Sequence, residues 1–365
     1  ERAEGHSQYL RWNEMNSQRE EYVDGMKGLA CFFVLLGHFT GIYKYAENAT
    51  AIDSWFTRML TKGPLSFFTA ESFWLYLFFV LSGYLLTMST PPPRKCSEFL
   101  KKCIKRVLRL AIPIMGAAVF TFAIQCTIGF YNFKIQDTVS NTWLTHLYGT
   151  QLTLRDIIEE PFRVLLLGSS KFNSPFWCLR DMLLASVIIY AVGWACKTAK
   201  IKGSILGVLI LLGAIVNRGV IVACLVGSMT GFLKQQFKTL KVPKVVAVCG
   251  VLSPIVAFFT ENLFVMDAAF ALCLLSVPIV PQVKSFFEAN FVKKTGSVSF
   301  GIYALHWPVI NSIGLGILYV LGKTISPAPL MLLSLAGVLL VTSILAILFK
   351  VTVERLTSIV CRVVK

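Results

Sequence analysis

The chain has 365 residues, of which 55% are hydrophobic and 15% are charged. About a quarter of the residues of a soluble globular protein are charged, so this composition excludes that class and indicates an integral membrane protein. The formal net charge of +16 also occurs in nucleic-acid-binding proteins, but here the basic residues gather in alternate loops, as the orientation of a multispan protein requires. We therefore expect membrane lipids, and no nucleic acid, as partners.

The ten cysteines include no C-x-x-C pair, and most lie in apolar runs or basic loops. Buried cysteine behaves as a small hydrophobe, so the sequence predicts neither a disulfide framework nor a metal site. We also expect no bound cofactor.

Apolar runs of the length that spans a bilayer core as a helix recur along the whole sequence. They predict an all-α fold, a polytopic membrane bundle of about ten transmembrane helices. The predicted spans are 25–43, 72–88, 108–130, 175–196, 203–217, 219–233, 245–260, 263–280, 297–321 and 328–350.

The loops between these spans differ in their content of lysine and arginine. The basic-rich loops and the basic tail fall on one side, which the positive-inside rule places in the cytoplasm together with both termini. Residues 1–24 and 351–365 are then cytoplasmic segments, and 25–350 form one transmembrane domain. Two long outer segments, 44–71 and 131–174, are expected to act as lids or binding surfaces, or only to cap the bundle.

The first predicted span carries Lys27 near its start and His38 deep inside. Their separation is about three helical turns, so the two side chains share a face, with His38 roughly 16 Å farther into the membrane. Asp24 shares that face and is able to pair with Lys27 or hold it in place. Ionisable groups inside a membrane often mark function. The alternatives are a lysine that snorkels to the interface and a histidine held by hydrogen bonds in the core.

Basic residues also gather where the chain enters the third predicted span, at Lys105, Arg106 and Arg109. The two arginines are spaced i, i+3 and point the same way on a helix. Two guanidinium groups on one face make a fork suited to phosphate or pyrophosphate. The alternative interpretation is positive-inside placement with contacts to lipid headgroups.

Later spans add three more candidates, Asp181, Tyr303 and His306. Asp181 follows Trp177 at the start of the fourth span, where an acid can orient a histidine of a neighbouring helix. Tyr303 and His306 share a face of the ninth span, and His306 is about 15 Å into the membrane, a depth similar to that of the first histidine. The alternative for His306 is a structural hydrogen-bonding position beside a proline break.

Four stretches, in order along the chain, resemble signature blocks of the membrane acyltransferase 3 family of multispan O-acyltransferases. They are VDGMKGLACFFVLLGHF at 23–39, LFFVLSGYLL at 77–86, FLKKCIKRVLRLAIPI at 99–114 and SVSFGIYALHWPVI at 297–310. A weaker fifth match is FWCLRDML at 176–183, where the family usually has a glutamate and this sequence has Asp181.

Two positions depart from the family pattern. Lys27 stands where the family commonly has arginine, so a bidentate contact would become a point-charge contact. The family often has an acid just before the paired phenylalanines of the second span, where this sequence has Leu77, and the nearest acid is Glu71. Both departures concern the contacts with donor and acceptor.

The resemblance implies an enzyme, an acyltransferase that moves an acyl group, most often acetyl, from a cytoplasmic acyl-CoA to a hydroxyl. The implied acceptor is a carbohydrate, a cell-envelope polymer or a lipid-linked molecule, and the implied location is the plasma membrane, as a multi-pass protein. Asp24 and Trp177 would give structural support. The implied donor-binding residues are Lys27, Lys105, Arg106 and Arg109.

His38 is then expected to be the general base that takes the proton of the acceptor hydroxyl. The alternative is a nucleophile that carries the acyl group as an acyl-imidazole. Asp181, Tyr303 and His306 complete the implied catalytic residues, because they would orient an imidazole or the acceptor, or stabilise the oxyanion.

A proton-coupled transporter is the main alternative function, because it too buries His, Arg and Asp in a polytopic bundle. Such transporters show repeats or matched broken spans in their two halves, and this sequence shows no such pairing. Within the acyltransferase class, the donor is acetyl-CoA or a longer acyl-CoA.

Overall fold

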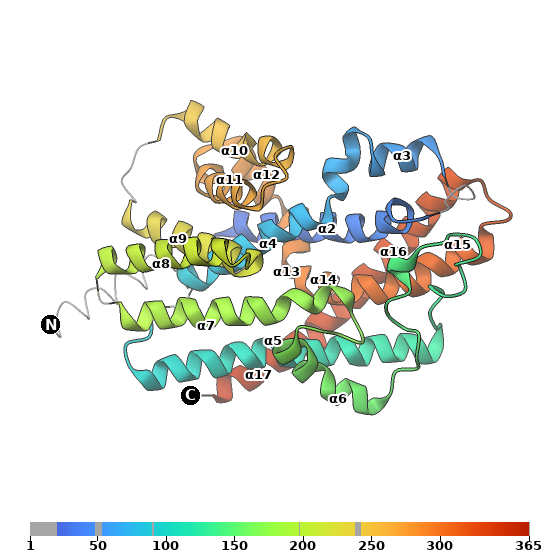
Figure 1. Cartoon of the computed structure of the whole chain (residues 1–365), viewed down its shortest axis with the longest axis horizontal. Helices are drawn as coiled ribbons and strands as arrows, with labels where there is room; N and C mark the ends of the chain where they lie inside the picture. The colour runs from blue at the N-terminus through green and yellow to red at the C-terminus, as the bar shows by residue number, and fades with distance from the viewer. Residues whose placement is uncertain (1–19, 48–52, 90, 197, 238–241, 365) are drawn as a thin grey trace. The chain divides into compact units, whose positions relative to one another are not determined.

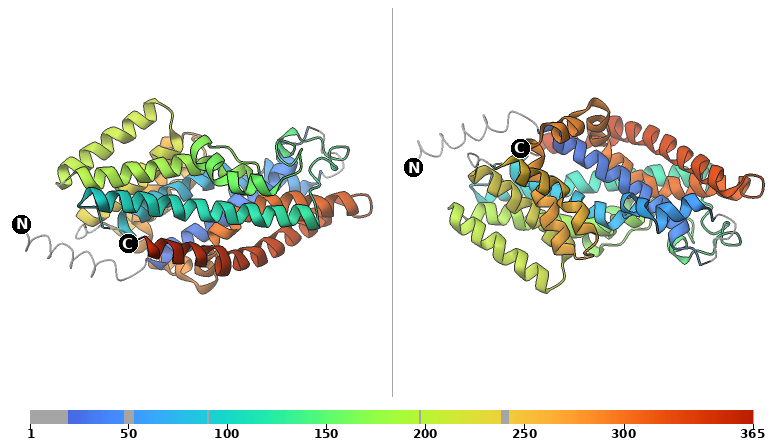
Figure 2. Two further views of the ribbon diagram at one scale, coloured as in Figure 1. Left: turned by 90° about the horizontal axis from the view of Figure 1, so that it is seen from below. Right: turned by 90° about the horizontal axis from the view of Figure 1, so that it is seen from above.

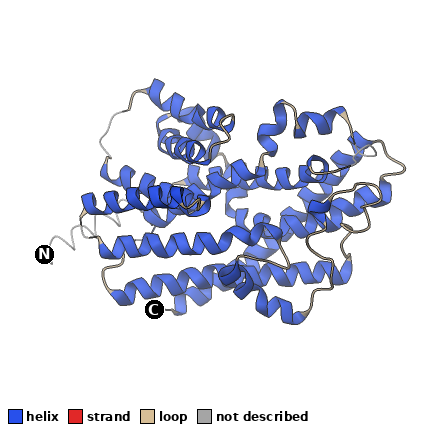
Figure 3. Cartoon of the chain, viewed as in Figure 1, coloured by secondary structure: helices blue, strands red, loops and turns tan. Residues whose placement is uncertain are grey.

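The computed structural model describes residues 20–47, 53–89, 91–196, 198–237 and 242–364 of the chain. Within these ranges the regular elements are helices, and no strand is present (Figure 3). The predicted all-α fold is therefore confirmed.

Six helical stretches are long and apolar enough to cross a membrane, and each coincides with a predicted span. The protein is therefore a polytopic helical membrane protein. The six stretches are α2 (Glu21–Lys44), α4 (Glu71–Ser89), α5 (Cys96–Thr127), η4 with α7 (Ser174–Cys178 and Leu179–Ala195), α14 with η6 and α15 (Ser299–Val309, Ile310–Gly314 and Leu315–Leu321), and α16 with η7 and α17 (Pro327–Phe349, Lys350–Glu354 and Arg355–Val363).

The other four predicted spans also fold as helices, but they do not all reach the length of a span. The helix α11 (Leu263–Ser276) is followed, across η5 (Val277–Ile279), by α12 (Pro281–Glu288) at a bend of 97°, and this pair makes a seventh span if it is one broken span. The helix α10 (Lys244–Phe258) has 15 residues, about 22 Å of helix, less than the roughly 30 Å of a bilayer core. The described residues thus support six or seven spans and do not confirm ten. The four helices are α8 (Ala199–Ile215), α9 (Gly219–Gln236), α10 (Lys244–Phe258) and α11 (Leu263–Ser276).

The helix α5 begins at Cys96, well before the start predicted at residue 108. The basic stretch that was expected as a loop is therefore the first part of this helix, and it carries Lys105, Arg106 and Arg109. Lysine and arginine are good helix formers, so a basic stretch before an apolar run does not end a helix. Arg106 and Arg109 therefore lie about one turn apart on the same helix, as their i, i+3 spacing predicts.

The chain divides into two compact units. In unit 1, α9 packs against α8 and α11, and α10 packs against α11. In unit 2, α14 and α15 pack along α16, which Figures 1 and 2 show from three directions, and η4 packs against α14. Unit 1 comprises the residues up to Leu29, Leu75–Arg106 and Asp181–Ser297; unit 2 comprises Ala30–Trp74, Val107–Arg180 and Val298–Lys365.

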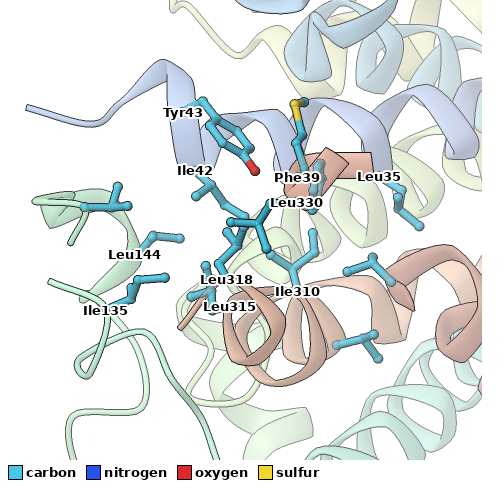
Figure 4. Close-up of a cluster of buried hydrophobic side chains, with 14 of the residues drawn as sticks. Leu35, Phe39, Ile42, Tyr43, Ile135, Leu144, Ile310, Leu315, Leu318 and Leu330 are labelled. Atoms are coloured by element: carbon cyan, nitrogen blue, oxygen red, sulfur yellow. The ribbon is translucent and has the colours of Figure 1, made fainter. Parts of the chain in front are cut away.

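The outer segment 131–174 is anchored in the apolar core of unit 2. Figure 4 shows that Ile135 and Leu144 of this segment lie in one cluster with Phe39 of α2 and Leu315 of α15. Both outer residues are completely buried. The segment is therefore part of the folded unit, which places its polar side chains at defined positions.

A short helix in the same outer segment, α6 (Leu154–Phe162), is held by an ion pair at its first turn. Thr153 and Asp156 form a capping box, and the Asp156 carboxylate lies 2.6 Å from the Lys171 ammonium. The hydrogen bonds from Lys171 and Thr153 lower the pKa of Asp156 from 3.8 to about 2. Because the folded-state pKa is depressed, this pair stabilises the segment above the unfolded value, and the contribution is lost as the pH falls through about 2.

Replacing Lys171 by methionine is expected to make the outer segment open at a less acidic pH. Without the ammonium the pKa of Asp156 rises again, so protonation and loss of the cap occur nearer to 3.8 than to 2. Pepsin cleavage within 131–174, followed between pH 2 and 4 in detergent (about the range of the two values), measures the shift. Lys134→Met, which removes an exposed lysine of the same segment, is the matched control. Equal cleavage profiles for both variants would contradict the assignment.

Candidate active site

The His38 side chain has a defined tautomer. Its Nδ1 lies 2.9 Å from the carbonyl oxygen of Val34, one turn earlier in α2. A carbonyl only accepts hydrogen bonds, so Nδ1 carries the proton, and Nε2 of the neutral ring holds the free lone pair. The residue is half-buried, and the Nε2 lone pair is able to act as a base.

His306, which the sequence placed at a depth similar to that of His38, is its neighbour in unit 2. The centroids of the two imidazole rings are 5.0 Å apart. Nδ1 of His306 lies 3.1 Å from the carbonyl oxygen of Ile302, so its Nε2 is also the acceptor. This nitrogen is buried and has no hydrogen-bond partner among the described residues.

Two tryptophans enclose the His38 ring. Trp143 of the outer segment stacks on it at 6.2 Å, and Trp307 of α14 meets it edge-on at 5.8 Å. Trp143 and Trp307 are themselves 4.8 Å apart. The indole N–H of Trp307 is buried without a partner in the described part of the chain. The buried donor of Trp307 and the buried acceptor of His306 both lack a partner among the described residues. Such groups are positions where a polar ligand or water binds.

A carboxylate approaches His38 from the start of α4. A Cβ atom at Gly37 would lie 2.6 Å from Cβ of Glu71, so the missing side chain at Gly37 lets α4 come this close. Glu71 accepts a hydrogen bond of 2.7 Å from the Tyr45 hydroxyl and lies 3.7 Å from the Lys44 ammonium.

Tyr303 connects α14 to η4. Its hydroxyl donates to the carbonyl oxygen of Pro175 and lies 3.2 Å from Sγ of Cys178. The Tyr303 ring is 6.1 Å from that of His306. Because the proton of Tyr303 is already donated to Pro175, this contact positions η4, and a role in oxyanion stabilisation would require the bond to break.

The expected donor-binding residues lie on α5 and α2. Arg106 donates to the hydroxyls of Ser186, at 2.9 Å, and Ser82, at 3.5 Å. Arg109 is exposed, and Lys105 is half-buried. Lys27 forms an ion pair of 3.0 Å with Asp24, on the helix that also carries His38.

The structure does not gather all predicted site residues in one unit. His38, His306, Tyr303, Arg109 and Trp177 belong to unit 2. Trp177 is 48% exposed, so it covers little of the site. Those assigned to unit 1 are Asp24, Lys27, Lys105, Arg106 and Asp181.

A family model described as an acyltransferase domain matches residues 20–348. The chain belongs to the acyltransferase 3 family. No curated protein and no solved structure matches it. The resemblance of the sequence blocks is therefore confirmed, and this acyltransferase 3 protein is a multi-pass membrane enzyme that transfers acyl groups.

Three residues of the site in this acyltransferase 3 protein were not predicted from the sequence. Trp307 follows His306 in a recognised block, but a tryptophan in an apolar span has no feature that singles it out. Trp143 lies in the outer segment 131–174. The sequence predicted a lid, a binding surface or a cap there, but it did not indicate which residue would contact His38. Glu71 stands out in the sequence only as the acid nearest to Leu77, the position that departs from the family pattern.

Proposed function

We propose that this acyltransferase moves an acyl group, acetyl in the simplest case, from a cytoplasmic acyl-CoA to a hydroxyl. The acceptor is a carbohydrate, a cell-envelope polymer or a lipid-linked molecule, and the enzyme acts in the plasma membrane with both termini in the cytoplasm. One observation carries the proposal. His38, a half-buried residue, has its Nδ1 proton held by Val34, which leaves the Nε2 lone pair available as a base.

In the proposed reaction, Nε2 of His38 takes the proton of the acceptor hydroxyl while the hydroxyl oxygen attacks the thioester carbonyl carbon. The new C–O bond replaces the C–S bond, and CoA leaves as a thiolate that takes up a proton. The N–H of Trp307, which has no partner among the described residues, is suited to the oxygen that becomes negative. The carboxylate of Glu71, whose Cβ lies close to Gly37 beside His38 in the chain, favours the imidazolium that forms. In a covalent variant, the same lone pair of His38 attacks the thioester directly and forms an acyl-imidazole.

The remaining predicted residues keep supporting roles in this proposal. Lys27, Lys105, Arg106 and Arg109 bind the phosphates of the acyl-CoA, since charge-assisted hydrogen bonds from guanidinium groups suit phosphate. His306, Tyr303 and Asp181 position the acceptor and the reacting imidazole.

Membranes that contain the full chain, supplied with radiolabelled acetyl-CoA, test the proposed function. They are expected to release CoA and to form a labelled ester, which mass spectrometry identifies together with the hydroxyl that carries it. Membranes without the chain provide the blank. Absence of chain-dependent CoA release with acetyl-CoA and with longer acyl-CoA donors would refute the donor class.

Replacing Arg109 by glutamine is expected to raise KM for acyl-CoA by about tenfold, with little change in kcat. One charge-assisted hydrogen bond to phosphate contributes about 1.5–3 kcal/mol, and a partly exposed contact is worth the lower part of that range. Arg109 is exposed, so folding should not change. The control is Lys101→Gln, which removes an exposed charge of the same helix. An equal rise of KM in both variants would show that only bulk charge matters.

A further inference from the structure

A histidine and a serine of the outer segment form a pair that the proposed function does not use. Nε2 of His146 lies 2.7 Å from Oγ of Ser174, and Nδ1 of His146 contacts the carbonyl oxygen of Trp143. The carbonyl accepts the Nδ1 proton, so the lone pair of Nε2 accepts the hydrogen bond from the serine hydroxyl. A serine hydroxyl bound to a histidine whose tautomer is fixed by a third group is the arrangement of an activated nucleophile.

This pair adjoins the His38 site. The His146 ring lies 5.4 Å from the Trp307 ring, and Trp307 lies 5.8 Å from the His38 ring. One indole therefore borders both histidines. An acyl group bound at the Trp307 ring would lie next to His38 and next to His146, the partner of the nucleophile Ser174.

Ser174 is also held in place by the helix that carries Trp307. The residue before it, Asn173, donates a hydrogen bond of 2.7 Å to the carbonyl oxygen of Ala304 in α14. The residue after it, Pro175, accepts the proton of Tyr303 in the same helix. Ser174 is half-buried and His146 is exposed. The nucleophile is thus fixed relative to α14 on both sides, and its base is open to an acceptor.

We propose that Ser174, activated by His146, carries the acyl group as a serine ester between the acyl-CoA and the acceptor hydroxyl. The inference rests on the proposed function and divides it into two half-reactions. In the first, Oγ of Ser174 attacks the thioester carbonyl carbon, its proton passes to Nε2 of His146, the C–S bond breaks, and CoA leaves as a thiolate.

In the second half-reaction, the acceptor oxygen attacks the carbonyl carbon of the serine ester, and its proton passes to Nε2 of His38. The bond from that carbon to Oγ of Ser174 breaks, and Oγ takes back the proton held by His146. The proton gained by His38 is lost to water and balances the one taken up by the CoA thiolate. Loss of His38 therefore blocks the second half-reaction and leaves the first intact.

The test uses full-length enzyme in detergent with radiolabelled acetyl-CoA, quenched in acid and digested for mass spectrometry. His38→Ala is expected to accumulate label on the peptide that contains Ser174, whereas Ser174→Ala forms no labelled peptide and loses transfer by about 100-fold or more. His146→Ala should slow the labelling. Ser174→Cys should give a thioester that neutral hydroxylamine removes. Ser169→Ala, at an exposed serine of the same segment, is the matched control and should behave as wild type.

A fluorophosphonate probe separates this inference from the proposed function, because it bonds to an activated serine without any CoA. Labelling of Ser174 that needs His146, without turnover of any acyl-CoA, would refute the proposed donor and leave the nucleophile standing. Acetyl transfer by Ser174→Ala at the wild-type rate, or label on another residue, would overturn the inference and leave the proposed function standing.

Discussion

Replacing His38 by alanine is expected to lower the rate of acyl transfer by about 100- to 10,000-fold, the range that a positioned general base contributes. The reason is that Nε2 of His38 is the base that the tautomer fixed by Val34 makes available, and alanine offers no atom to take a proton. The change should lower kcat of the complete transfer. Release of product at saturating radiolabelled acetyl-CoA, measured on membranes with equal amounts of each variant, gives this constant.

Two controls distinguish loss of the base from loss of the fold. The variant should unfold in detergent at nearly the temperature of wild type, because a single hydrogen bond of a half-buried side chain contributes only about 1 kcal/mol. Imidazole added to His38→Ala should restore part of the rate, since it supplies the missing base from solution. A variant that keeps more than about a tenth of the wild-type rate would rule out His38 as the base.

The largest effect on stability is expected at Gly83, in the block LFFVLSGYLL of α4. A Cβ atom at Gly83 would lie 1.7 Å from the carbonyl oxygen of Cys224 in α9, and one at Gly227 of α9 would lie 1.9 Å from that of Val80 in α4. The two helices of unit 1 therefore touch backbone to backbone, as small residues allow in membrane proteins. Replacing Gly83 by valine forces them apart, and we expect a loss of about 3 kcal/mol or more.

Thermal unfolding and size-exclusion profiles in detergent measure this loss. The matched control is Gly207→Ala in α8, where a Cβ atom would meet nothing within 4 Å. Alanine there should leave stability unchanged or raise it by up to about 1 kcal/mol, because glycine is the poorer helix former. If Gly83→Val unfolds at the same temperature as Gly207→Ala, the close contact of α4 and α9 is not a stabilising feature.

Local features of the site were predictable from the sequence. Hydropathy located α2, and the helical period placed Lys27 and His38 on one face, because the register within one helix depends only on residues of that helix. The i, i+3 spacing of Arg106 and Arg109 was predictable for the same reason, even though α5 begins earlier than the hydropathy indicated. Four blocks in order were enough to identify the family.

The number of spans was not predictable in this way. Apolar runs marked ten helices, and the structure has a helix at each of them, but among the described residues six or seven meet the length and apolar composition of a span, so ten spans are not confirmed. Hydropathy measures how apolar a run is, whereas breaks such as the 97° bend before α12 depend on how neighbouring helices pack.

The sequence by itself determined the family, the all-α class and the places of His38 and His306 within apolar helices. These features depend on composition, on sequence blocks and on spacing within single helices. Only the tertiary structure decided which distant residues surround His38. Trp143, which stacks on His38, and His146, which borders Trp307, come from an outer segment whose position is set by the burial of Ile135 and Leu144 in the core of unit 2. Glu71 lies against Gly37, the residue before His38, because glycine lets α4 approach there. Such contacts join residues far apart in the chain, so they depend on packing between elements and not on any pattern within one of them.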